Sequence, residues 1–446
     1  MTPDTTTSTS AKPASRAEHE VAELCSELIR IDTTNRGNGQ GREREAAEYV
    51  AGKLDEVGLA SELFESAPGR TSVVARIEGA DPSREALLIH GHLDVVPADA
   101  SDWKKHPFSG ELGEDGCVWG RGAVDMKDMD AMTLAVVRER MRSGRKPPRD
   151  VVLAFVADEE AGGAYGARWL VDTKPELFEG CTEAISEVGG FSYTLDDGQR
   201  LYLIETAQKG IAWMKLTVTG RAGHGSMTAA DNAVTELCEA VARVGRHEFP
   251  VRLTDTVRSF LEDVGDATGV AFDPDDPEAA VARLGDVGRI VGATLRDTAN
   301  PTQLDAGYKV NVIPGQATAH IDGRFLPGSE EEFERTLAEL LGPRVQREWV
   351  WHDQALETTF DGALVDAMSA AIRAEDPEGR PVPYMLSGGT DGKSFARLGM
   401  RIFGFSPLRL PKDLDFAGMF HGIDERVPVD GLQFGVRVLD TFLDNC

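Results

Sequence analysis

The segment Val151-Val-Leu-Ala-Phe-Val-Ala-Asp-Glu-Glu160 joins seven consecutive apolar residues to three consecutive carboxylates. An apolar run without alternation predicts a strand that is covered on both faces, which is typical of a parallel sheet. Adjacent glutamates at the end of such a strand repel each other and contribute nothing to folding. A metal site, by contrast, can use one of them as a ligand and the other as a proton acceptor. We therefore predict an α/β fold with a reactive site where this strand ends.

Short apolar runs at residues 72–77 and 86–89 precede this segment, and patterns typical of amphipathic helices flank the runs. Alternating strands and helices predict an α/β layer with a central mixed, largely parallel sheet. Ligands in such sheets bind at the carboxyl ends of the strands. Because His92, Glu159 and Glu187 each follow a predicted strand, we expect them to meet at one edge of the sheet.

The composition excludes several classes of partner. The 446 residues carry a formal net charge of −28, which disfavours nucleic acid and anionic membranes, because their phosphates require positive charge. No apolar run reaches the roughly 18 residues of a membrane-spanning helix. The five cysteines are scattered and show no C-x-x-C spacing, so we expect a reducing, cytoplasmic location rather than a disulfide framework.

The pattern changes after residue 207. Residues 210–219 alternate between apolar and polar side chains, as an antiparallel strand does. The elements expected after them are a helix at 231–244, strands at 308–313 and 316–325, a helix at 330–341 and a strand at 344–351. This β-α-β-β-α-β order is that of a ferredoxin-like unit.

The simplest organisation is an α/β domain into which the ferredoxin-like α+β domain is inserted. We expect a disordered tail at 1–16, the α/β domain at 17–207 and 354–446, and the inserted domain at 208–353. The tail is rich in Thr, Ser, Pro and Ala and lacks the apolar core of a signal peptide. An Asp-, Gly- and Pro-rich insert at about 251–305 is expected to form short helices and loops.

Several short motifs carry residues that can bind metal, and each is ambiguous alone. In His92-Leu-Asp94 the two polar side chains face the same way, and a histidine ligand usually donates its second ring N–H to a carboxylate. The alternative is that Asp94 caps the strand end and His92 is a satisfied polar residue. Asp125 precedes a helix, where it is either an N-cap or a carboxylate that bridges two metals.

Two further candidates have equally plain alternatives. Glu187 precedes a pair of glycines and is either a loop residue or a ligand. His421, in Met-Phe-His421-Gly-Ile-Asp-Glu425, is a surface histidine if it is taken alone. Only the combination of all these motifs in one chain favours the metal site.

Taken together, the motifs of residues 92–94, 120–128, 158–163, 187–190 and 421–425 resemble the M20 family of dinuclear zinc metallopeptidases and amidohydrolases. That family includes glutamate carboxypeptidases, aminoacylases, acetylornithine deacetylase and succinyl-diaminopimelate desuccinylase. The resemblance covers nearly the whole chain and implies a zinc-peptidase-like catalytic domain with an inserted lid. It also implies two Zn²⁺ per subunit, with Co²⁺ or Mn²⁺ as substitutes.

The resemblance assigns a role to each candidate. His92 and Glu187 would hold one zinc, Glu160 and His421 the other, and Asp125 would bridge them. Asp94 would orient His92, and Glu159 would be the general base that serves a metal-bound hydroxide. A cis peptide bond is expected after Asp125.

The lid supplies further residues by the same resemblance. His224 would stabilise the oxyanion, in dimeric members at the other subunit's active site, although a turn histidine among glycines is the alternative. Arg324 and Asn311 would bind substrate, the arginine through a free carboxylate that its fork can engage. The backbone of Gly388, Gly389 and Thr390 would approach the same carboxylate.

These roles predict a dizinc hydrolase that cleaves an amide or peptide bond in a small substrate with a free carboxylate. The substrate would be a dipeptide or peptide, or an N-acyl amino acid. A biosynthetic deacylase of the acetylornithine or succinyl-diaminopimelate type is the alternative, and a non-catalytic binding protein is a remote one. We expect a homodimer formed through the lid, and a monomer if the insert at 251–305 covers the dimer surface.

Overall fold

The computed structural model describes residues 14–37, 39–269, 271–284, 288 and 291–446. Its largest sheet has ten strands, with a main order of β1-β2-β6-β3-β7-β18-β9-β16, and β8 and β17 also pair with β9. The strands are β1 Ser61–Ala67, β2 Arg70–Ile77, β3 Ala86–His92, β6 Val151–Val156, β7 Cys181–Ser186, β8 Phe191–Thr194, β9 Arg200–Gln208, β16 Leu356–Glu357, β17 Arg380–Leu386 and β18 Arg401–Gly404.

Three central strands are parallel neighbours, because β3 pairs in parallel with β6 on one side and with β7 on the other. The sheet as a whole is mixed, since β2 pairs with β6 and β18 with β9 in antiparallel fashion. The prediction of a central mixed sheet in an α/β fold is confirmed. The carboxyl ends of β6, β3 and β7 therefore lie side by side at one edge.

Both faces of β6 are buried, as the apolar run predicts. Val151, Leu153 and Phe155 join one hydrophobic core, while Val152 and Ala154 join a second core on the other face. The first core is covered by α1 Arg16–Arg30, α2 Arg44–Asp55, α3 Lys127–Ser143, α10 Ala363–Glu375 and α12 Val429–Asn445, and the second by α4 Ala167–Thr173 and α11 Gly392–Ala396. A small sheet of β4 Glu111–Leu112, β5 Cys117–Trp119 and β19 Arg426–Pro428 adjoins them.

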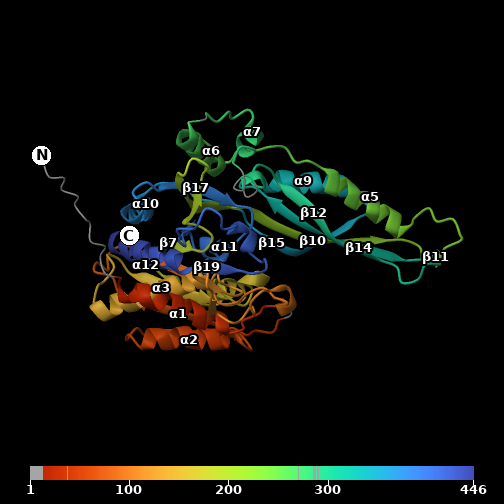
Figure 1. The fold of residues 1–446 in the computed structure, drawn as a ribbon. Coiled ribbons are helices and arrows are strands. Elements are labelled where there is room, and N and C mark those ends of the chain that lie inside the picture. Colours follow the sequence, from red (N-terminus) through yellow and green to blue (C-terminus); the bar gives the residue numbers. More distant parts are fainter. Residues whose placement is uncertain (1–13, 38, 270, 285–287, 289–290) are drawn as a thin grey trace, which may run out of the picture.

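A separate four-stranded sheet extends away from this body (Figure 1). Its order is β12-β14-β10-β15, with every pair antiparallel, and α5 and α9 cover one face with a hydrophobic core of their own. This is the strand order of a ferredoxin-like unit, and we call it the lid sheet. Its elements are β10 Gly210–Thr219, α5 Ala233–Arg246, β12 Thr298–Ala306, β14 Gln316–Phe325, α9 Glu330–Leu341 and β15 Gln346–Asp353.

The second strand of the lid sheet lies elsewhere in the chain than predicted. It is β12 at Thr298–Ala306, whereas the predicted strand at 308–313 contains only the two-residue β13 Val312–Ile313, which pairs with β11 Gly223–His224. The expectation of loops up to residue 305 was therefore wrong for β12. Its asparagine, proline and aspartate are rare in strands, and such residues are tolerated best at an edge, which is where β12 lies.

The described apolar residues of the insert's helices pack on the main body. The helix α6 Asp255–Thr268 places Val257, Phe260 and Leu261 in the first core, and the short α7 Pro277–Val281 follows it. Residues 1–13 of the predicted tail lie outside the described residues, and α1 begins at Arg16 after a Ser15 cap. The domain boundaries at 208 and 353 stay a prediction. Among the described residues, no helix is long and apolar enough to cross a membrane.

Candidate metal centre

The edge formed by β6, β3 and β7 gathers the predicted polar residues. His92 is the last residue of β3, and Glu187 directly follows β7. Glu159 and Glu160 begin the short turn that follows β6. Ligand atoms of His92, Glu159 and Glu187 lie within 4.8 Å of one another, as do those of His92, Asp125 and Glu160. The sequence-based expectation that these strand ends meet is met by the structure.

Asp125 lies between the two imidazoles. Its Oδ1 is 3.0 Å from His92 Nε2, and its Oδ2 is 3.2 Å from His421 Nε2. His92 Nε2 is also 3.4 Å from Glu187 Oε2, and His421 Nε2 is 3.1 Å from Glu160 Oε2. One carboxylate thus has a histidine and a glutamate on each side. The Asp125–Met126 peptide bond is cis, as expected.

The orientation of the His92 ring directs its Nε2 atom toward two carboxylates. His92 Nδ1 is 2.9 Å from the backbone carbonyl oxygen of Asp94, and a carbonyl can only accept, so Nδ1 carries a proton. The other ring nitrogen, Nε2, faces the carboxylates of Asp125 and Glu187, where a proton or a metal ion can occupy it. Separations of 3.0 to 3.4 Å between these atoms are close to the ligand spacing of about 3.3 Å in a tetrahedral zinc site. The donor set of imidazoles and carboxylates therefore fits divalent metal ions.

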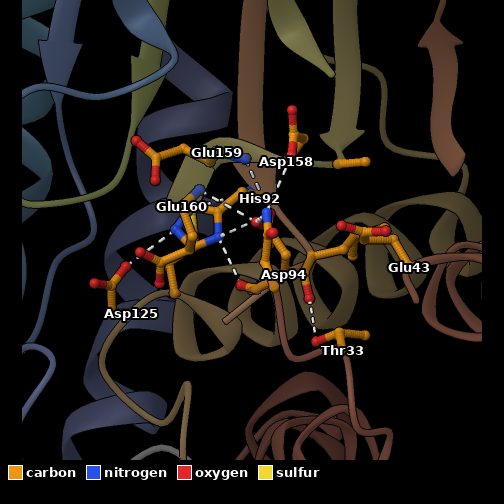
Figure 2. A network of polar contacts seen from close by, with 12 residues as sticks. Thr33, Glu43, His92, Asp94, Asp125, Asp158, Glu159 and Glu160 are labelled. Atoms are coloured by element: carbon orange, nitrogen blue, oxygen red, sulfur yellow. Dashed lines mark hydrogen bonds and ion pairs between the residues drawn. The ribbon is translucent and has the colours of Figure 1, made fainter. Parts of the chain in front are cut away.

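The carboxylate of Asp94 does not make the contact that the sequence predicted. Its Oδ1 is 3.8 Å from His92 Nδ1, and the backbone carbonyl orients the ring instead. The Asp94 carboxylate accepts the backbone N–H groups of Glu159 and Glu160, each at 3.1 Å, and the side-chain amide of Asn35 at 2.8 Å (Figure 2). Asp94 therefore fixes the turn that carries the two glutamates.

Glu159 and Glu160 have different surroundings. Glu160 contacts His421 and accepts the backbone N–H of Val96 at 3.2 Å. In Figure 2 the Glu159 carboxylate points away from Asp94 and its hydrogen-bond partners. Glu159 contacts Asp94 through its backbone N–H instead. Glu160 is thus held beside a histidine, whereas the Glu159 carboxylate lies near ligand atoms of His92 and Glu187 without a hydrogen bond to Asp94.

Burial and mutual repulsion dominate the electrostatics of the cluster. Burial, followed by the charge of Glu187, holds the pKa of Glu159 well above its usual value. Burial and the neighbouring Asp125 raise the pKa of Glu160 to about 7. Hydrogen bonds to Asp125 and Glu160 raise the pKa of His421 to about 10. In the protein alone, these glutamates are therefore harder to ionise than free carboxylates.

Sequence reasoning missed the residue that holds the Asp125 loop. The fully buried Glu425 accepts the backbone N–H groups of Gly122 at 3.1 Å, Val124 at 2.7 Å and Asp125 at 3.2 Å. Arg121 Nη1 donates to the same carboxylate at 2.6 Å. Glu425 stands four residues after His421, and this spacing was the only signal in the sequence.

Arg324, one of the predicted substrate residues, lies near the end of β14 in the lid sheet. Arg324 donates to Asp322 at 2.6 Å and 3.1 Å and lies over the ring of Trp213. Its cross-strand partner Ile211 adjoins the glycine loop, because a Cβ on Gly389 would lie 3.2 Å from Ile211 Cδ1.

The glycine loop continues from Gly388 through Gly389 to Thr390, which is tied down by Gln208. The Thr390 N–H donates to Gln208 Oε1 at 3.0 Å, and Gln208 Nε2 donates to Thr390 Oγ1 at 2.8 Å. The loop is therefore anchored at the end of β9, where the chain enters the lid sheet.

His224 and Asn311 are not brought to the metal ligands of their own chain. Both are exposed, and they lie on adjacent turns because the Gly225 N–H donates to the Asn311 carbonyl at 2.9 Å. The β11 strand that ends at His224 lies at the far end of the lid sheet from β7 and α12 (Figure 1). Within this chain, His224 and Asn311 form a separate surface at the far end of the lid sheet, which we call the lid tip.

Comparison with known proteins agrees with this geometry. The model of Peptidase family M20/M25/M40 matches residues 88–445, and the chain belongs to this family of amide-bond hydrolases. The chain is 28% identical over 387 residues to the probable carboxypeptidase S-like 2 of Dictyostelium discoideum, covering 80% of this chain and 71% of that protein. It is 25% identical to aminoacylase-1 of Sus scrofa, covering 94% and 93%.

Two further similarities extend the comparison. The N-fatty-acyl-amino acid synthase/hydrolase PM20D1 of Xenopus tropicalis is 26% identical over 464 residues, which cover 97% of this chain and 87% of that protein. The crystal structure of an M20 family metallo-carboxypeptidase from Sulfolobus solfataricus has the same fold, with a TM-score of 0.74, 18% identity and coverage of 96% and 99%.

The Glu425→Gln substitution tests the support of the Asp125 loop. An amide removes the counter-charge of buried Arg121 and one of two acceptors for three backbone N–H groups. We expect a loss of about 3–5 kcal/mol in the free energy of unfolding, the usual cost of breaking a buried ion pair. Urea unfolding of the metal-free protein measures it, with the exposed Glu378→Gln as the control. Equal stability of the two variants would contradict the role of Glu425.

Proposed function

We propose that the protein is a dizinc hydrolase that cleaves the amide bond of a small substrate with a free carboxylate, either a peptide or an N-acyl amino acid. The observation that carries this proposal is the position of Asp125, whose two oxygens contact two different histidines. A carboxylate in that position suits a bridge between two metal ions.

The proposed ligand set follows these contacts. His92 and Glu187 hold one ion, and Glu160 and His421 hold the other. Two ions offset the charge of the buried carboxylates and supply the positive field that activates a water molecule for attack on an amide. Zinc suits imidazole and carboxylate ligands, and Co²⁺ or Mn²⁺ suit them as substitutes.

Glu159 then acts as the general base and general acid. Its carboxylate takes a proton from the attacking water and delivers it to the nitrogen of the cleaved bond. Support comes from its place within 4.8 Å of His92 and Glu187 ligand atoms, combined with its freedom from the Asp94 network. Asp94 keeps this carboxylate in reach by holding its backbone.

Arg324 is the proposed partner of the substrate carboxylate. It lies on the lid strand next to Ile211, which adjoins the glycine loop of Gly388, Gly389 and Thr390. Its present partner Asp322 leaves Nη1 without a described hydrogen bond, and a substrate carboxylate can compete for the fork. Arg324 is thus the local positive charge that an anionic substrate needs in a protein with a net charge of −28.

The lid tip is the proposed dimer contact. His224 and Asn311 are exposed there together with the apolar side chains of Met227, Tyr308 and Val310. Such a cluster suits burial against a second copy, which would place His224 at the partner's metal centre. The insert helix α6 packs on the main body, so it leaves this tip uncovered. The five free cysteines agree with the proposed cytoplasmic location.

Substituting the two adjacent glutamates one at a time separates proton transfer from metal binding. Glu159→Gln should abolish amide hydrolysis and leave the metal content unchanged, whereas Glu160→Gln should lower the metal content as well. Metal analysis and turnover assays of the two variants measure this, with chelation and zinc restoration of the wild-type protein as the reference. An active Glu159→Gln enzyme would refute the base assignment.

A substrate screen tests the free-carboxylate requirement. Dipeptides, N-acyl amino acids, N-acetylornithine and N-succinyl-diaminopimelate are compared with the carboxamide form of the best substrate. Arg324→Met should lower kcat/KM for the carboxylate about 10-fold or more, because hydrogen bonds to charged groups contribute about 1.5–3 kcal/mol. The same variant should leave the carboxamide unaffected. Equal losses for both forms would rule out a specific contact with the carboxylate.

Mixed dimers test the proposed contribution of His224 in trans. His224→Ala should lower kcat by about 10²–10³-fold, the usual effect of losing an oxyanion donor. Co-expression with Glu159→Gln subunits should restore activity, because the mixed dimer contains one site with an intact Glu159 and a His224 from the partner. If mixing restores nothing, His224 does not act across subunits.

A further inference from the structure

The lid carries a further group of side chains that could ligate a metal, apart from the centre at the strand ends. It consists of Glu330 and Glu334 on α9 and His352 on β15, whose ligand atoms lie within 4.8 Å of one another. None of the three has a role in the proposed hydrolysis.

The local structure explains why these side chains meet. Glu330 and Glu334 are four residues apart, so they lie on the same side of α9. His352 is paired with Ala212, whose side chain belongs to the lid core beneath α5 and α9. Because directly paired residues point to the same side of a sheet, His352 faces the helix that carries the glutamates.

The contacts of His352 are spaced like metal ligands rather than like hydrogen bonds. Nε2 lies 3.3 Å from Glu330 Oε1 and 3.5 Å from Glu334 Oε1. The atom is buried, and neither oxygen lies in hydrogen-bond geometry with it. Charge-assisted N–H···O bonds are shorter, about 2.7–2.9 Å. Ligands of a tetrahedral zinc ion bound at about 2.0–2.1 Å are about 3.3 Å apart, which agrees with both separations.

Neighbouring residues hold two of the three ligands in place. The His352 ring packs against Trp349 and Phe325, with centroid separations of 4.7 Å and 5.8 Å. Arg347 Nη2 donates to Glu334 Oε2 at 3.1 Å, so the other oxygen of Glu334 is the one that faces His352. Outer contacts of this kind orient metal ligands in proteins.

We propose that Glu330, Glu334 and His352 form an additional site for one divalent transition-metal ion of the zinc class. Two carboxylates and a neutral imidazole balance its charge. The side chains are 46%, 35% and 27% exposed, which leaves room for water as the remaining ligand. The ion would tie α9 to the end of β15, where the chain leaves the lid sheet.

Metal counting tests this site in the full-length protein. Equilibrium dialysis against a fixed concentration of free Zn²⁺, followed by elemental analysis, compares the wild type with His352→Gln, Glu330→Gln and Glu334→Gln. Each variant should bind one ion fewer per chain than the wild type. Glu331→Gln is the matched control, because it removes the same charge from an exposed neighbouring position on α9 and should bind as many ions as the wild type.

The result does not depend on the ions at the strand ends, because the readout is a difference between chains that share that centre. Equal zinc content in all the variants would overturn the proposed site, and so would a loss in Glu331→Gln as large as in the ligand variants. A second readout is the visible absorption of bound Co²⁺. The part of the spectrum that is lost in His352→Gln should also be lost in Glu330→Gln, and independent changes would count against a shared ion.

Discussion

The burial of like charges is the constraint on which this structure depends. Asp125, Glu159, Glu160 and Glu187 converge at the ends of three parallel strands, with His92 and His421 among them. Burying unpaired carboxylates is costly, and a protein tolerates it only where cations or hydrogen bonds compensate. The arrangement therefore suits the binding of positive ions rather than the stability of the fold.

Two further carboxylates, Asp94 and Glu425, hold the backbone of the cluster. Asp94 fixes the turn before Glu159 and Glu160, and Glu425 fixes the loop before Asp125, each by accepting backbone donors. These two buried carboxylates position other carboxylates through the backbone. The side chains proposed as metal ligands and general base are thereby placed by the peptide chain.

The sequence predicted what depends on local pattern. The apolar run before Asp158 identified a strand buried on both faces, and the motifs around His92, Asp125 and His421 identified residues that the structure brings together. It could not identify Glu425, because that role arises from contacts 300 positions away. It also misplaced the lid strand β12, because residues such as Asn300 and Pro301 are unfavourable in strands and are accepted there only because the strand lies at an edge.

The contact between Glu425 and Asp125 also bears on how the protein is made. The two residues are separated by 300 positions in the chain, and the whole lid sheet lies between them in the sequence. Contacts between distant parts of a chain form late, and an N-terminal portion synthesised first holds Asp125 without its support. A nascent chain would therefore contain Asp125 without the support of Glu425 until its C-terminal part has been synthesised. The proposed metal centre is for this reason complete only when the C-terminal part of the chain has folded onto the rest.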